Sequence, residues 1–264
     1  MCASPVASMV FATLLVSSVC LGQAANPPAP DLPRPVKSRQ QLSLKSPTFT
    51  FVRIQHSVAP ARGRRAAHWA TDYPDSDIQL TARIAADIGM ATNAKGQVLR
   101  LTDPQLKSFP FIYLVEPGSL ELTDAEVESL REYLTGGGFL MVDDCWGAAE
   151  RERCLAQFKR VFPDREPREL PLHHEIFHCF YDLTEKPQVP SVHTWASRAS
   201  QDLPAVSYQG LFDDAGRMAV ILCLNTDLGD GWERSGDDER YAREMSQRRA
   251  FPMGVNIVVY ALTH

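Results

Sequence analysis

The chain has 264 residues, of which 44% are hydrophobic, and its formal net charge is -5 with a pI near 5.8. This length suits one large domain with a short appendage, and the apolar share is sufficient for a globular core. The acidic balance leaves no broad basic surface, so we exclude a general nucleic-acid binder and expect no nucleic-acid partner.

Residues 1–25 have the pattern of a signal peptide. An apolar run over Met9–Val16 is followed by small residues and by Gln23-Ala24-Ala25, which resembles a cleavage site. The run is too short to span a bilayer, and we expect no membrane span in the mature chain. The sequence therefore predicts an exported protein, periplasmic or secreted. An uncleaved N-terminal anchor is the alternative, because no Lys or Arg precedes the apolar run.

Residues 26–47 are rich in proline and predict a tether that leads to a single domain over residues 48–264. The cysteines of this domain form no C-x-x-C pair, which excludes a zinc ribbon and leaves disulfide pairing open. Cys223 lies in an apolar run and is expected to be a buried, small hydrophobic residue.

The first half of the domain alternates apolar strands with helices. Thr48–Ile54 alternates like a first strand, and Asp75 or Ser76 can cap the helix that ends at Gly89. The Thr123-Asp124-Ala125-Glu126 motif is a capping box for a second helix. Further strands are expected at 98–101, 109–115 and 139–142, and a further helix at 155–161. This order predicts an α/β fold with a doubly wound, mostly parallel sheet.

The second half is less regular. Residues 163–205 hold many prolines and the clustered histidines, and predict a long irregular insertion. Residues 206–212 and 218–224 predict a hairpin. A polar loop over 225–238 and a final helical region complete the chain.

Polar residues follow three of the predicted strands. Glu116 follows the first, Asp143 and Asp144 the second, and Asn225 and Asp227 the third. If these strands are parallel, their carboxyl ends share the edge where α/β folds place ligands. Clustered carboxylates can bind a hard cation or accept hydrogen bonds from sugar hydroxyls.

Trp146 and Trp232 are candidate stacking surfaces beside these carboxylates. The alternative is structural: Asp144 caps the next helix, and the loop 225–233 is a turn whose Asp side chains bond their own backbone. Taking the group as a ligand site, the candidate residues are Tyr73, Asp77, Glu116, Asp143, Asp144, Trp146, His174, Asn225, Asp227, Asp230 and Trp232. No residue is assigned as catalytic or as a metal ligand, and the cofactor is unknown.

Two further motifs are weaker. His174-Glu175-Ile176-Phe177-His178 matches H-E-x-x-H, whose histidines can chelate zinc on a helix, but nearby prolines disfavour that helix. Cys145 has part of a nucleophile elbow, but two carboxylates beside it would suppress the thiolate. We expect packing or a disulfide there.

The ordered motifs Tyr73–Asp77, Phe109–Tyr113, Gly137–Asp144, Asn225–Glu233 and Tyr260–His264 resemble the bacterial family called domain of unknown function 4159. The resemblance covers roughly residues 48 to 264. It implies a flavodoxin-like sandwich of the class I glutamine-amidotransferase-like type, related to trehalose-utilisation (ThuA-like) domains. The family more often has an aromatic residue at Cys145 and a proline at Glu175, which weakens both the thiol nucleophile and the zinc motif.

Three functions stay open, and the sequence does not decide whether the protein is an enzyme. The first is a ligand-binding domain that lacks amidotransferase chemistry and takes a small polar ligand, with carbohydrate as one class. The second is a carboxylate- or metal-dependent hydrolase, with His174 as its acid or base. The third is a scaffold with other envelope proteins as partners.

Overall fold

The computed structural model describes Met1 and residues 32–38, 41–44, 48–57, 68–197 and 202–264. The predicted signal peptide, apart from Met1, lies outside the described residues. The described part of the predicted tether packs against the domain, because Val36 N donates to Phe180 O at 2.7 Å and Pro35 forms a bridge with Tyr181. None of the helices in the described residues combines the length and the apolar sequence that a bilayer span requires.

Seven strands of the described chain form one sheet in the order β2-β1-β3-β4-β7-β6-β5. Strands β2, β1, β3, β4 and β7 run parallel, whereas β6 and β5 each pair antiparallel with their neighbour. The bounds are Thr48–Ile54 for β1, Ala91–Leu99 for β2, Phe111–Val115 for β3, Phe139–Cys145 for β4, Arg168–Glu169 for β5, Ser207–Phe212 for β6 and Met218–Leu224 for β7. The doubly wound, mostly parallel, flavodoxin-like sheet is thus confirmed.

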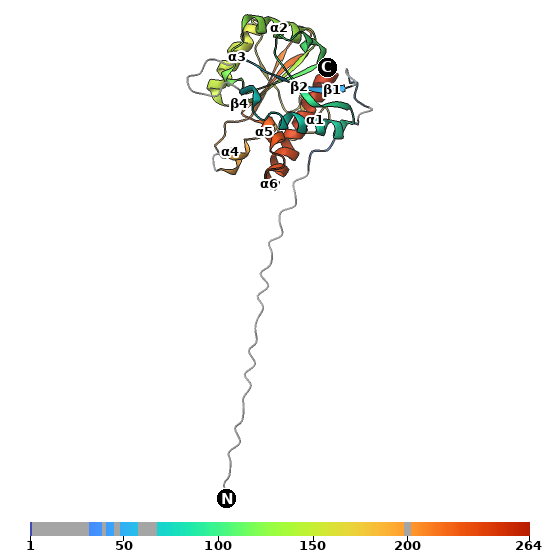
Figure 1. The fold of residues 1–264 in the computed structure, drawn as a ribbon, viewed down its shortest axis with the longest axis vertical. Helices are drawn as coiled ribbons and strands as arrows, with labels where there is room; N and C mark the ends of the chain where they lie inside the picture. Colours follow the sequence, from blue (N-terminus) through green and yellow to red (C-terminus); the bar gives the residue numbers. More distant parts are fainter. Residues whose placement is uncertain (2–31, 39–40, 45–47, 58–67, 198–201) are drawn as a thin grey trace. The chain divides into compact units, whose positions relative to one another are not determined.

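Helices cover both faces of the sheet (Figure 1). Two lie on one face, α2 (Asp124–Thr135) and α3 (Gly147–Val161). The other face is covered by α1 (Asp75–Ile88), α5 (Leu228–Glu233) and α7 (Phe251–Thr263). The short helix α6 (Glu239–Tyr241) continues through a wider π-helical stretch, η7 (Ala242–Ala250), into α7. The short helix α4 (Val192–Ala196) contacts α6 through the rings of Trp195 and Tyr241. Short 3-10 turns are η2 (His68–Ala70), η3 (Pro104–Ser108), η4 (Pro117–Ser119) and η5 (Glu175–Phe177).

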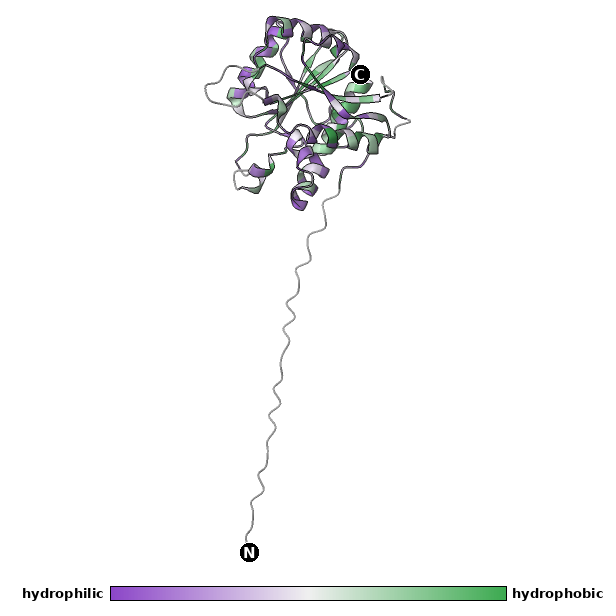
Figure 2. Cartoon of the chain, viewed as in Figure 1, coloured by the Kyte–Doolittle hydropathy of each residue, from purple (hydrophilic) through white to green (hydrophobic). Residues whose placement is uncertain are grey.

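The central strands β3, β4 and β7 are buried on both faces, which explains their continuous apolar sequences. In β3, Phe111 and Tyr113 pack with the α1–α5–α7 face, whereas Ile112 and Leu114 pack with α2 and α3. Hydropathy follows the same division, since the sheet is apolar and the outer helical surfaces are polar (Figure 2).

Several helix ends are as expected. In the capping box of α2, Glu126 N donates to Thr123 Oγ1 at 3.2 Å, and Thr123 N donates to Glu126 Oε2 at 2.8 Å. Helix α1 ends at Gly89, whose φ of 67° is left-handed. At the start of α1, however, neither Asp75 nor Ser76 acts as the cap, and no side chain does so.

The sequence predicts a polar loop over 225–238, but the structure forms α5 within it. Asp227 caps this helix by accepting a hydrogen bond from Asp230 N at 2.8 Å. Asp144 does not cap α3, because Trp146 is the residue at that position and Asp144 instead accepts from the indole of Trp146. The prediction that Asp144 caps the next helix is therefore wrong. The prediction that Asp side chains of the loop 225–233 bond their own backbone holds for Asp227.

The H-E-x-x-H motif is not on an α-helix. It forms η5, where His174 Nδ1 accepts from Ile176 N at 3.2 Å and His178 contacts Asp182 and Leu172 O. His174 and His178 therefore form hydrogen bonds in and around this turn, and they do not share one face of an α-helix as the zinc motif requires.

Candidate functional site

A pocket of about 350 Å³ lies at the carboxyl edge of the sheet. The chain leaves β1 toward β2 on one side and returns to β3 on the other, so the edge between β1 and β3 is the topological switch point where such folds bind ligands. The pocket is lined by Thr71, Asp72, Glu116, Asp144, Trp146, Ser191, Thr194, Leu203, Asp227 and Asp230. These residues come from the loops after β1, β3, β4 and β7 and from the segment around α4.

Arg53 of β1 positions the first of these loops. Its guanidinium is fully buried and binds Asp77 through Nε and Nη2, the shortest contact being 2.5 Å. Its Nη1 donates to the carbonyl oxygens of Trp69 and Thr71 at 3.0 and 2.9 Å. Because Arg53 holds the backbone on both sides of residue 70, it fixes where Asp72 enters the pocket. Asp77, a predicted site residue, therefore supports the loop from behind.

Glu116 follows β3 directly and is bound by the same loop. Thr71 Oγ1 donates to Glu116 Oε1 at 2.6 Å, and His68 Nδ1 pairs with Glu116 Oε2. The carboxylate of Glu116 is thus held between η2 and the pocket.

Asp143 and Asp144 end β4 with different roles. Asp143 is fully buried behind the pocket, where its Oδ2 accepts from Tyr113 Oη at 3.2 Å and from Gly229 N at 3.0 Å. Its Oδ1 has no partner among the described residues. Asp144 faces the pocket and accepts from Trp146 Nε1 at 2.7 Å, so the indole ring is held at the rim.

Asp230 joins three elements. Its Oδ2 accepts from Val192 N of α4 at 2.7 Å and from Tyr241 Oη of α6 at 2.9 Å, and the residue itself lies on α5. Figure 1 shows α4, α5 and α6 at the same end of the molecule. Asn225 contributes indirectly, since its side chain accepts from Gly147 N and donates to Ala205 O at the rim.

Four residues at this edge have left-handed backbone conformations. Asp72, Glu116, Asp144 and Asn225 have φ values of 61°, 49°, 58° and 57°, and they are all the non-glycine residues with positive φ in the described chain. Each such residue carries roughly 1 kcal/mol or more of backbone strain, and strain of this kind clusters at functional sites. The fold therefore concentrates its strained backbone around the pocket.

The crowded carboxylates alter one another's ionisation. Burial, together with the negative charges of Asp230 and Glu233, raises the pKa of Asp72 to about 8, although Arg53 opposes the shift. Burial raises the pKa of Asp143 to about 7. Burial and neighbouring carboxylates also raise the pKa values of Asp144 and Asp227 above their ordinary range.

Three predicted residues lie away from the pocket. Trp232 is fully buried, with its Nε1 donating to Ala250 O at 2.9 Å, so it is a core residue and not a stacking surface. Tyr73 is 41% exposed and does not line the pocket. His174 lies at the opposite edge of the sheet, because its ring is 6.0 Å from Tyr260, which in turn packs on Phe139 at the start of β4.

Sequence reasoning missed several residues that the structure brings to this region: His68, Thr71, Asp72, Ser191, Thr194, Glu233 and Tyr241. Asp72 had one usable signal, since it directly precedes Tyr73-Pro74 at the start of α1. Ser191 and Thr194 had none, because they belong to the irregular insertion.

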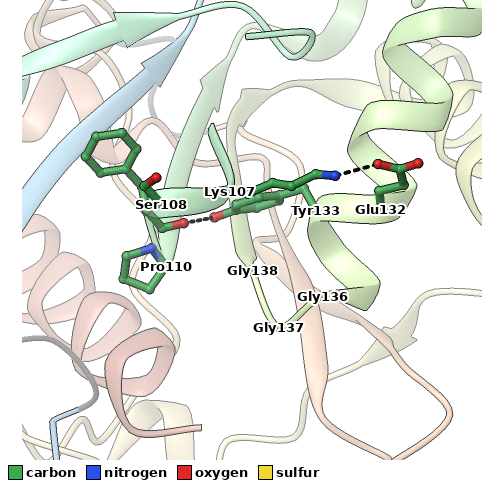
Figure 3. A pocket seen from close by; sticks show the side chains of 9 residues that line it. Lys107, Ser108, Pro110, Glu132, Tyr133, Gly136, Gly137 and Gly138 are labelled. Carbon is green, nitrogen blue, oxygen red and sulfur yellow. Dashed lines mark hydrogen bonds and ion pairs between the residues drawn. The ribbon is translucent and has the colours of Figure 1, made fainter. Parts of the chain in front are cut away.

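A larger hollow of about 510 Å³ lies at the amino ends of β3 and β4 (Figure 3). Three of its polar side chains are already paired: Lys107 Nζ binds Glu132 at 2.7 Å, and Tyr133 Oη donates to Phe109 O at 3.0 Å. Much of the remaining lining is glycine backbone, so the hollow offers little chemistry compared with the acidic pocket.

The cysteines of the described chain are free and buried. Cys145 packs on the α2–α3 face together with Cys154, on the opposite side of the sheet from Asp143. A thiol nucleophile at Cys145 is thus not available to the pocket. Cys223 is fully buried, as predicted.

One protein family matches the chain. No curated protein matches the chain. The family described as Domain of unknown function (DUF4159) matches residues 50–262, which include every strand from β2 to β7 and most of β1. The chain therefore belongs to the DUF4159 family, as the sequence motifs predicted.

Proposed function

We propose that this domain binds a small polar ligand of the carbohydrate class in the acidic pocket at the carboxyl edge of its sheet. The observation that carries the proposal is the lining: five of its ten residues are Asp or Glu, and none is basic. The carboxyl oxygens accept hydrogen bonds, and the protonated carboxyl of Asp72 can donate one, so the walls suit a ligand that presents many hydroxyl groups.

Two further features support this class of ligand. The indole of Trp146, held by Asp144, offers an aromatic face beside the carboxylates. The pocket volume of about 350 Å³ suits a ligand of one or two sugar rings and lies within the range of small-molecule sites.

We propose that the binding takes place outside the cytoplasm, in the periplasm or after secretion. The support is the N-terminal sequence, with its apolar run and small residues before Asn26. We also propose kinship with class I glutamine-amidotransferase-like and ThuA-like domains without their chemistry, supported by the strand order and by the position of Cys145 away from the pocket.

The proposal is tested by thermal unfolding of the purified protein against a panel of mono- and disaccharides. A ligand at about 100 times its Kd adds roughly 2.7 kcal/mol, which corresponds to a rise of about 5–10 °C in Tm for a domain of this size. We expect Asp144→Asn to abolish the rise, and the exposed Asp164→Asn to retain it as the matched control. A panel without any response, or an unchanged response in Asp144→Asn, would contradict the proposal.

A hydrolase is the second candidate, favoured by Asp72. Because its pKa is about 8, Asp72 keeps a proton at neutral pH, and a pocket-lining carboxylic acid of this kind can act as a general acid. Release of nitrophenol from nitrophenyl glycosides by the wild type but not by Asp72→Asn would favour this function. Sugar binding without turnover would favour the binding domain.

A further inference from the structure

Two cysteines meet where β4 ends and α3 begins. Cys145 is the last residue of β4, and Cys154 lies on α3. Their side chains are 1% and 0% exposed and belong to the same apolar cluster, between the sheet and the layer of α2 and α3. The thiol of Cys154 shares a hydrogen bond with the thiol of Cys145, so the two side chains are in contact.

The backbone fixes this approach from both sides. The end of β4 is held by its parallel pairing with β7. Trp146 alone separates β4 from α3, and Gly147, with a φ of 71°, turns the chain back so that α3 covers the sheet. Arg153, the neighbour of Cys154, donates through Nε to Gly118 O at 2.6 Å and anchors α3. The contact between the two thiols is therefore built into the β4–α3 unit.

The other two cysteines of the described domain lie on the opposite face of the sheet. Cys179 and Cys223 belong to the apolar cluster under α1, α5 and α7. Cys179 Sγ donates to Asn256 O at 3.0 Å there. The sheet separates this second pair from Cys145 and Cys154, so neither member competes for them.

The chemistry of a cross-link here is a simple oxidation. Two S–H bonds break and one S–S bond forms, and the two electrons and two protons pass to a disulfide oxidant, which becomes two thiols. Oxidised glutathione and exported thiol–disulfide oxidoreductases are oxidants of this class. The bond needs Cβ atoms that lie close together, and two hydrogen-bonded thiols already meet that condition.

The cross-link must form while the chain folds. The attacking species is a thiolate, but the hydrogen bond with Cys145 and burial raise the pKa of the Cys154 thiol. Both side chains are also sealed from solvent once α3 covers the sheet. An oxidant therefore reaches them before the core closes, and the closed core afterwards protects the bond from reductants.

We propose that Cys145 and Cys154 form an internal disulfide that clamps the start of α3 to the end of β4. The bond brackets Trp146, whose indole lies at the rim of the acidic pocket, and so restrains the turn that carries this ring. The inference goes beyond the proposed function. An oxidising compartment outside the cytoplasm would supply the oxidant, but the bond is tested without any ligand.

The first test is refolding of the full chain from denaturant, either with oxidised glutathione or with a phosphine reductant. Each sample is then alkylated in denaturant and digested with trypsin. Trypsin cuts after Arg151 and Arg153, between the two cysteines, so the bond joins peptide 132–151 to peptide 154–159. We expect this joined pair in the glutathione sample only, and alkylated Cys179 and Cys223 in both samples.

The second test is thermal unfolding of the same two samples. A bond that closes a loop of about ten residues restricts the unfolded chain, and we expect the oxidised protein to melt roughly 5–10 °C above the reduced protein. Cys154→Ala should remove this difference. Cys179→Ala, which also removes a buried thiol, is the matched control and should retain the difference.

Alkylated Cys145 and Cys154 in the glutathione sample would overturn the inference. A joined pair that contains Cys179 or Cys223 instead would do the same, and equal Tm values of the two wild-type samples would refute the clamp. If Cys154→Ala does not fold, the peptide map and the two Tm values of the wild type decide.

Discussion

Replacement of Asp143 by Asn is expected to stabilise the protein above pH 7 and to change its stability little near pH 4. Asp143 is fully buried, and its pKa rises from 3.8 to about 7, mainly because burial disfavours the charged form. At roughly 1.4 kcal/mol per pKa unit, the shift corresponds to roughly 4 kcal/mol of destabilisation once the group is ionised in the folded state. Asn can still accept from Tyr113 Oη and Gly229 N but carries no charge.

The sign follows from the protons bound in each state. The unfolded chain loses the Asp143 proton near pH 4, whereas the folded protein keeps it to about pH 7, so the folded state holds more protons between these values. The free energy of unfolding of the wild type therefore falls as the pH rises through this window, and the contribution of Asp143 is constant above it. Asp72, Asp144 and Asp227 add to this slope, so only the difference between variant and wild type isolates Asp143.

The assay is urea unfolding in EDTA at about pH 4.5 and about pH 8.5, with the exposed Asp164→Asn as control. The measured quantity is the free energy of unfolding of the variant minus that of the wild type. We expect this difference to rise by up to about 4 kcal/mol from about pH 4.5 to about pH 8.5 for Asp143→Asn, and not to change for the control. If Asp143→Asn is less stable than the wild type by the same amount at both pH values, the reasoning from burial is refuted.

Three other substitutions test separate parts of the structure. Gly229→Ala should lower stability by about 1–3 kcal/mol, because its Cβ would lie 2.6 Å from Asp72 Oδ2 and 2.8 Å from Tyr113 Oη; a wild-type urea curve would contradict this. Arg53→Met should lower stability by roughly 3–5 kcal/mol, since it leaves the Asp77 carboxylate buried without an opposite charge; a loss under about 1 kcal/mol on urea unfolding would argue against the pair. Thr123→Ala should reduce the free energy of unfolding by about 1 kcal/mol through loss of the cap, and no change would show that the capping box is dispensable.

The helix ends and the buried central strands could be predicted from the sequence. The capping box of α2, the glycine at the end of α1 and the buried strands β3 and β4 were all predictable, because each needs only the neighbouring residues. The parallel pattern of the strands also predicted that the loops after β4 and β7 meet at one edge of the sheet. The hydrogen bond from Asn225 N to Cys145 O, at 2.8 Å, joins these two loops.

The remainder depends on tertiary contacts that no periodicity encodes. Asp72 enters the pocket because Arg53 binds the loop backbone from a strand that lies earlier in the sequence. Tyr241 reaches Asp230 only because α6 packs beside α5. Trp232 was misassigned for the same reason, since its ring packs against Phe51 and Tyr113 of the sheet once α5 is formed.

The central claim, that the acidic pocket is where this protein binds its ligand, is tested most directly by a crystal structure with a saccharide from the panel. We expect the sugar to lie between Asp144, Asp227 and the indole of Trp146, with its hydroxyls donating to the carboxylates. A sugar bound in the hollow around Tyr133, or at any place that leaves these residues untouched, would contradict the account.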